Sequence, residues 1–179
     1  MAKVQSIARV DNLGEMSDEI LALSSTLGVA ASDVAEAVYQ SISAGVSSAD
    51  AVDFTGLAIK LSKAGFTDAA TAVDVLTTAI NAYGLSMDDA EKVADNLIAT
   101  QNLGKTSVDE LASSMGKIIP LASATGVGLD DLTAILADLT SNGQGTAESV
   151  TGLKAMLNEL SKEGSTVGNV LVNETGQSF

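Results

Sequence analysis

The chain has 179 residues, 46% of them hydrophobic, which is enough for a folded domain with a buried core. Its 9 Lys and Arg residues against 23 Asp and Glu residues leave a net charge of −14, which argues against specific nucleic-acid binding and against attraction to anionic membranes. Neither His nor Cys occurs, which excludes disulfides, the usual zinc ligands and a Ser-His-Asp triad.

Glycines divide the chain at intervals of 17 to 22 residues and predict where helices end. A glycine lacks Cβ, so it readily adopts the left-handed conformation that closes a helix. The apolar residue after each glycine is expected to pack back on the last turn. These junctions are expected at Gly28, Gly45, Gly65, Gly84, Gly104, Gly126, Gly143 and Gly164.

Polar residues after these glycines predict where the next helices begin. Asp68 belongs to one such signal, while Ser86 with Asp89 and Thr106 with Asp109 fit the acidic form of the capping box. In this motif the Ser or Thr oxygen accepts a hydrogen bond from an N–H group of the first turn. The sequence therefore predicts a rapid succession of short helices.

Between the glycines, apolar residues recur at helical spacing, as in residues 54–61, and no segment alternates as a strand does. Gly116 and Pro120 are expected to divide the sixth helix. The predicted fold class is all-α, an array or irregular bundle of about eight short antiparallel helices joined by Gly-capped turns. Helix length repeats, but the sequence follows no TPR, ankyrin or HEAT signature, which disfavours a strict solenoid.

We expect two parts in the chain. Residues 1–164 form the helical region, and residues 165–179 look like the start of a following segment that is truncated. The second part has a short apolar patch at 167–172 and no cap at its end. The sequence therefore resembles a fragment of a longer protein.

One segment approximates a phosphate-binding loop. Residues 99–106 read ATQNLGKT, with Ala in place of the first glycine of that motif. A working loop follows a β-strand and directs free N–H groups at the phosphate. Here residues 86–98 are predicted to form an amphipathic helix. The segment is therefore interpreted as a helix end followed by a helix start.

Adjacent acidic residues occur at Asp18–Glu19, Asp88–Asp89, Asp109–Glu110 and Asp130–Asp131. Neighbouring residues on a helix point in different directions, unlike the facing acids of a glycosidase. We expect all four pairs in first turns, where they complement the helix dipole. No calcium-binding loop is present. We therefore expect no catalytic, cofactor-binding or metal-binding residues, and no enzyme activity.

Several blocks of sequence resemble the conserved core of phage tail tape-measure proteins of the TP901 type. The central blocks are AGFTD at 64–68, AVDVLTT at 72–78, NAYGLS at 81–86 and LGKTSVDELASS at 103–114. Residues 27–29 with 35–40, and residues 147–148 with 152–154, flank them in the order found in that family. The resemblance covers nearly the whole chain from about Ile20 onward.

The resemblance implies a structural protein that acts as scaffold and length ruler in tail assembly, without catalytic residues in this core. Implied partners are other copies of the chain, tail tube and tail tip proteins, and tail assembly chaperones. Implied locations are the lumen of the virion tail and, during assembly, the host cytoplasm. Membrane contact is expected only during ejection.

Two other function classes stay open at this stage. One is a stand-alone helical module that binds a partner protein in an apolar groove. The other is a membrane-active segment used during DNA ejection. The length of the parent gene and its neighbours would separate the first from a tail protein, and liposome leakage would test the second.

Overall fold

The computed structural model describes residues 13–162, 165–166, 169 and 173. Within these ranges the chain is helical and contains no strand, so the all-α prediction is confirmed. Gly164 and most of the 165–179 tail lie outside the described residues. The helices are α2 (Leu13–Leu27), α3 (Ala31–Ser43), α4 (Ala51–Ala64), α5 (Ala69–Tyr83), the 3₁₀ turn η1 (Met87–Asp89), α6 (Ala90–Leu103), α7 (Val108–Met115), α8 (Ile119–Ala124), α9 (Leu129–Ser141) and α10 (Thr146–Leu160).

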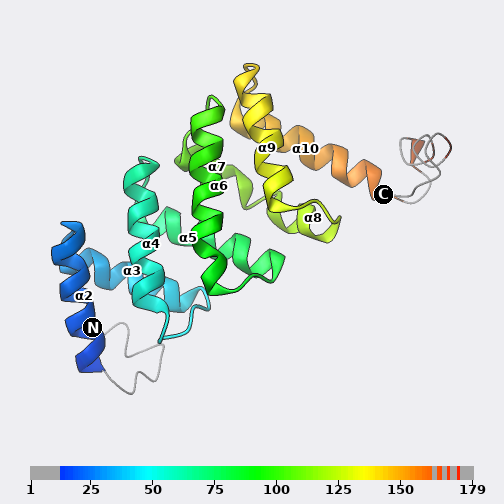
Figure 1. Ribbon diagram of the computed structural model, residues 1–179. Coiled ribbons are helices and arrows are strands. Elements are labelled where there is room, and N and C mark those ends of the chain that lie inside the picture. The colour runs from blue at the N-terminus through cyan, green and yellow to red at the C-terminus, as the bar shows by residue number, and fades with distance from the viewer. Residues whose placement is uncertain (1–12, 163–164, 167–168, 170–172, 174–179) are drawn as a thin grey trace.

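The helices form two layers that run along an elongated array (Figure 1). Helices α2, α4, α6 and α9 make the first layer, and α3, α5, α7 with α8, and α10 make the second. First-layer helices begin at Leu13, Ala51, Ala90 and Leu129, so successive two-helix units start 38 or 39 residues apart. The described region is therefore a regular stack of helix pairs, as in α-solenoids, and is more ordered than an irregular bundle.

Glycines end the helices largely as the sequence predicts. Gly84 has φ 62° and ψ 34°, and its N–H donates to the carbonyl oxygen of Ile80. A residue with a Cβ is strained in this left-handed conformation. The predicted division between α7 and α8 is also confirmed, with Pro120 in the first turn of α8. The positive-φ glycines are Gly28, Gly45, Gly84, Gly126 and Gly143.

Two junction glycines differ from the prediction. Gly65 and Gly104 both have φ −94°, so neither is left-handed. At the first junction the left-handed residue is Phe66, with φ 53°. An ideal Cβ on Gly65 would lie 2.5 Å from the Cβ of Val108. These glycines are needed because the next unit packs directly on them, a contact that local sequence does not reveal.

Helix starts are predicted to within one or two residues. Asp68 caps α5, because its Oδ1 accepts a hydrogen bond of 2.8 Å from the Thr71 N–H. The Ser86–Asp89 capping box is present, and the Ser86 N–H donates to Asp89 Oδ2 at 2.9 Å. The capping box expected at Thr106 is wrong by one residue. There α7 is capped instead by Ser107, whose Oγ accepts from the Glu110 N–H at 3.2 Å.

The core lies between the two layers and is built from aliphatic side chains. Alanines such as Ala51, Ala58 and Ala72 are fully buried and let neighbouring helices approach closely. Buried Thr and Ser hydroxyls donate to carbonyl oxygens of the preceding turn, as Thr133 does to Leu129 at 2.9 Å. Among the largest fully buried side chains are Ile59, Leu76, Ile80, Leu97, Leu111, Met115, Ile118, Ile119, Leu132 and Leu136.

Side chains of one unit also cap the helices of the unit before it. Lys63 Nζ of α4 donates to the carbonyl oxygen of Leu27, the last residue of α2. In the next unit, Gln101 Nε2 of α6 donates at 3.4 Å to the carbonyl oxygen of Ala64, the last residue of α4. Terminal carbonyl groups of a helix have no partner within it. Stacking therefore supplies hydrogen bonds as well as apolar contact.

Candidate functional site

The phosphate-loop-like segment is a helix end followed by a helix start, as predicted. Helix α6 continues to Leu103, and the Gly104 N–H donates to the carbonyl oxygen of Thr100 at 2.9 Å. The Val108 N–H donates to Gln101 Oε1 at 2.8 Å. These N–H groups already have partners inside the protein and do not point at a phosphate site. The segment therefore lacks the preceding strand of a phosphate loop, and two of the N–H groups around its glycine are already bonded within the protein.

The acidic pairs do not converge on a site. Three pairs lie in first turns, in η1, α7 and α9, as predicted. The Asp18–Glu19 pair lies further along α2, whose first-turn acid is Glu15, so that part of the prediction is wrong. The hydroxyl of Ser86 donates to the Asp89 carboxylate at 2.6 Å and lowers its pKa. In the part of the chain that the structure describes, no group of three acidic residues could hold a metal ion.

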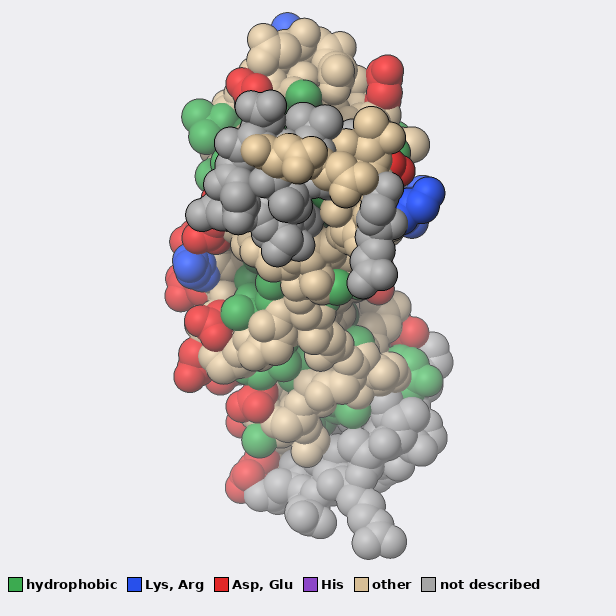
Figure 2. Space-filling view, turned by 90° about the vertical axis from the view of Figure 1, so that its right-hand side faces the viewer, with side chains coloured by type: hydrophobic (Ala, Val, Ile, Leu, Met, Phe, Trp, Pro, Cys, Tyr) green, Lys and Arg blue, Asp and Glu red, His purple; other side chains and the backbone are tan. Residues whose placement is uncertain are grey.

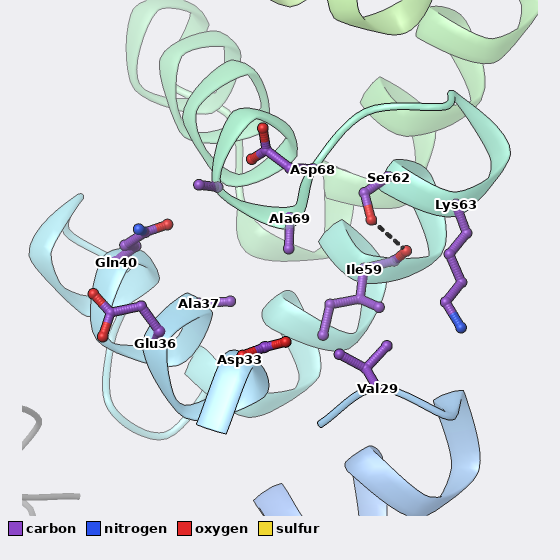
Figure 3. Close-up of a pocket in the computed structure, with 11 residues that line it drawn as sticks. Val29, Asp33, Glu36, Ala37, Gln40, Ile59, Ser62, Lys63, Asp68 and Ala69 are labelled. Carbon is purple, nitrogen blue, oxygen red and sulfur yellow. Dashed lines mark hydrogen bonds between the residues drawn. The ribbon is translucent and has the colours of Figure 1, made fainter. Parts of the chain in front are cut away.

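A groove of about 390 Å³ opens between α3, α4 and the start of α5 (Figure 3). We call it the α3–α5 groove. Its interior is apolar and is formed by Val29, Ala37, Ile59 and Ala69. This volume falls at the lower end of the range for small-molecule pockets. The groove is therefore large enough for one or two side chains of a partner.

Three polar side chains around the α3–α5 groove have structural partners. The Ser62 hydroxyl donates to the Ile59 carbonyl oxygen at 2.9 Å, and Asp68 caps α5. Lys63 caps α2. Figure 3 shows the carboxylates of Glu36 and Asp68 directed away from the middle of the groove. These three side chains are therefore engaged within the protein.

The first residue of each second-layer helix decides where such grooves open. These residues are Ala31, Ala69, Val108 and Thr146. The Val108 side chain is fully buried and occupies the space beside Gly65. Beside the smaller Ala69 the α3–α5 groove remains, and a groove of about 490 Å³ opens beside Thr146. The repeat therefore places grooves at equivalent positions beside Ala69 and Thr146.

Two large apolar side chains on the surface were not expected from the sequence. Phe66, predicted to pack back on α4, has 87% of its surface exposed, and Leu103 at the end of α6 has 73% exposed. Both lie at the carboxyl ends of neighbouring first-layer helices. The interval of 39 residues between Gly65 and Gly104 equals the period of the two-helix units. This interval is the sequence signal that could have identified the two junctions as equivalent.

Charge is distributed unevenly over the surface. Figure 2 shows acidic side chains along the left-hand side of the molecule from top to bottom, with few Lys or Arg among them. The only ion pair among the described residues joins Lys92 to Asp130, with 3.4 Å between Nζ and Oδ2. Apart from Glu36 and Asp130, no carboxylate among the described residues is shown to pair with a basic side chain.

No single described helix is both long enough and apolar enough to cross a membrane. Helices α2 and α3 reach the required length and hydropathy together, but the chain bends by 119° between them. Both contribute buried side chains to the core.

Comparison with known proteins places the chain in a family. The family model for the phage-related minor tail protein matches residues 17–177. None of the curated proteins and none of the solved structures matches the chain. The matched region includes every described unit of the helical array, from near the start of α2 to beyond α10. The chain belongs to the phage-related minor tail protein family, whose members are structural proteins of the phage tail.

Proposed function

We propose that this chain is part of a tape-measure protein, which scaffolds tail assembly and sets tail length. The observation that carries the proposal is the regular array of two-helix units, which start 38 or 39 residues apart. In such an array each unit contacts its neighbours, so length grows by the same increment with every added unit. A protein whose length is proportional to its residue number is suited to measuring.

Two lengths are available to the same residues. In the stacked form, a two-helix unit adds about one interhelix distance, or ~10 Å. As a continuous helix, 38 residues would span about 57 Å at ~1.5 Å per residue. The free chain adopts the stacked form because its apolar stripes would otherwise face water. In the tail, we propose that the stripes pack between copies of the chain, so that the segment is elongated in the lumen.

Deleting one whole unit from the parent phage tests this proposal. Removal of residues 67–104 takes out α5 and α6 and joins α4 to α7, so the order of the two layers is kept. Electron microscopy should show tails shorter by about 57 Å, rounded to whole rings of the tail tube. Duplicating the same segment is the matched control and should lengthen tails equally.

The outcomes of the deletion are distinct. Shortening by about 10 Å would retain the measuring role and contradict the elongated form. Infectious tails of unchanged length in both variants would contradict the proposed role in length measurement.

The proposed partners are other copies of the chain, tail tube and tail tip proteins, and tail assembly chaperones, which the chain would first meet in the host cytoplasm. Crosslinking of assembled tails would identify them.

A membrane-active role during ejection is the second candidate, and the observation in its favour is the combined length and hydropathy of α2 and α3. Dye leakage from liposomes would test it. Because α2 and α3 supply core residues such as Ile20 and Val38, insertion would first require them to separate from the array. Leakage is therefore expected only under conditions that unfold the first unit.

A further inference from the structure

A second groove, of about 480 Å³, lies in the first layer between α4 and α6, and we call it the α4–α6 groove. Apolar side chains from three elements form part of its surface: Leu23 of α2, Phe54 and Leu57 of α4, and Met87 of η1. Phe54 is buried, and the other three are partly exposed. The lining also includes four acidic residues and a single lysine, namely Asp50, Asp53, Asp88, Glu91 and Lys60.

The next unit contains an equivalent groove, between α6 and α9, in which a lysine and an acid form an ion pair. Lys92 Nζ lies 3.4 Å from Asp130 Oδ2, and Asn96 Nδ2 donates to Asp130 Oδ1 at 2.7 Å. All three residues line this groove. Both carboxylate oxygens of Asp130 therefore have a donor from the facing helix.

A shift of 39 residues toward the N-terminus maps this trio onto the α4–α6 groove, where the two donors have no counterpart at the equivalent positions. Asp53 stands in place of the lysine, Leu57 in place of the asparagine, and Glu91 in place of the acceptor. Within the described part of the chain, neither Asp53 nor Glu91 has a hydrogen bond or ion pair from its side chain. Two carboxylates therefore line the groove where its neighbour holds a lysine and an acid.

We propose that the α4–α6 groove binds a segment of a partner protein that presents a Lys or Arg beside an aliphatic side chain. The cation would take the place that Lys92 occupies in the neighbouring groove, between Asp53 and Glu91, and form charge-assisted hydrogen bonds. The aliphatic side chain would cover Leu57 and Met87. This surface is independent of the measuring role, because it needs only the folded array.

Charge complementarity selects this occupant. Two like charges in one groove repel each other, and an incoming cation relieves that repulsion while forming two attractive pairs. A second copy of the chain is a poorer occupant, because its net charge is −14 and its basic residues number 9. Nucleic acid would add further negative charge.

A synthetic peptide provides the probe. We would use a fluorescently labelled helical peptide of about 15 residues, with Lys and Leu at i, i+4 spacing, and follow fluorescence anisotropy at ~0.15 M salt. The full chain should bind it saturably. Asp53→Lys, which gives this groove the charge pattern of its neighbour, should weaken binding about tenfold or more. Thermal melting should show that this variant remains folded.

The matched control is Asp74→Lys, which makes the same change in net charge on α5, in the second layer. It should change the affinity by less than about twofold, because at this salt concentration charges beyond ~8 Å are largely screened. Equal weakening by both variants, or no effect of Asp53→Lys, would overturn the proposal. Sedimentation without peptide adds one more outcome. A dimer that Asp53→Lys disrupts would identify a second copy as the occupant and would also overturn it.

Discussion

Gly65 and Val108 are packed so closely that no side chain fits between them. A Cβ on Gly65 would lie 2.5 Å from the Cβ of Val108 and 2.6 Å from its Cγ2, and the valine is fully buried. The two residues lie in successive units, at the end of α4 and the start of α7. Their contact therefore determines how closely one helix pair approaches the next.

Gly65→Ala is expected to destabilise the fold by about 1–3 kcal/mol, because it overpacks this contact. Urea unfolding would measure the change. Val108→Ala, which leaves a cavity, is also expected to destabilise on its own. In the double variant the new methyl fills space that the valine vacates, so the two effects should be less than additive. Strict additivity would show that the residues do not constrain each other.

Gly84→Val should destabilise by more than about 1 kcal/mol, because a β-branched residue is forced to φ 62°. The matched control is Gly152→Ala. Gly152 lies within α10 and has open space around its Cβ position, so alanine should stabilise the helix by about 0.5–1 kcal/mol. Melting temperatures would separate the two cases. An unchanged melting temperature for Gly84→Val would mean that the left-handed end of α5 does not matter for stability.

Asp68→Ala should cost about 1 kcal/mol at pH 7, because it removes the N-cap of α5. The Thr71 N–H donates to the Asp68 carboxylate and holds its pKa below the ordinary 3.8. The capping contribution is therefore complete above the unfolded pKa and is lost as pH falls through the lower, folded value. The difference between wild type and Asp68→Ala should shrink below about pH 4.

Urea unfolding at a series of pH values would measure this dependence. Asp68→Asn keeps an acceptor at the cap and should show a smaller loss than alanine at pH 7. Asp74→Ala, on the exposed side of α5, serves as the comparison and should change stability by less than about 0.5 kcal/mol. A gap between wild type and Asp68→Ala that widens in acid would contradict the assignment.

ATP with Mg²⁺ should give no saturable heat in a calorimetric titration. The Gly104 N–H is already bonded to Thr100, and α6 stands where a phosphate loop has a strand. Lys105→Ala should leave the titration unchanged. Binding that disappears in this variant would reveal a nucleotide site in residues 99–106.

Local features of the fold could be predicted from the sequence, whereas the stacking of units could not. Gly84 and Pro120 act through their own backbone geometry, so the sequence around them is sufficient. The glycine at position 65 is instead required by its contact with Val108, which lies 43 positions later in the chain. The regular period was missed because equivalent positions hold different residues, as Asp53 and Lys92 do. The side chains at equivalent positions differ from unit to unit, but the helices alternate between the two layers in the same order.

The grooves were not predictable for a related reason. Ala69 and Val108 occupy equivalent positions in successive units, and the α3–α5 groove lies beside the smaller of the two. Nothing in the local pattern around Ala69 distinguishes a groove from a filled contact. The sequence interpretation that no catalytic, cofactor-binding or metal-binding residues are present stays a prediction.

The hydrogen bond from Gln101 to the last carbonyl of α4 has a consequence for how the length of the gene can change. A unit that is duplicated or lost as a whole keeps the order of the two layers, so first-layer helices still meet first-layer neighbours. A gain or loss of half a unit would exchange the two layers and separate donors from acceptors. Viable length variants of the gene are therefore expected to differ by multiples of 38 or 39 codons, the interval between equivalent helices. Recombination between neighbouring repeats would generate them.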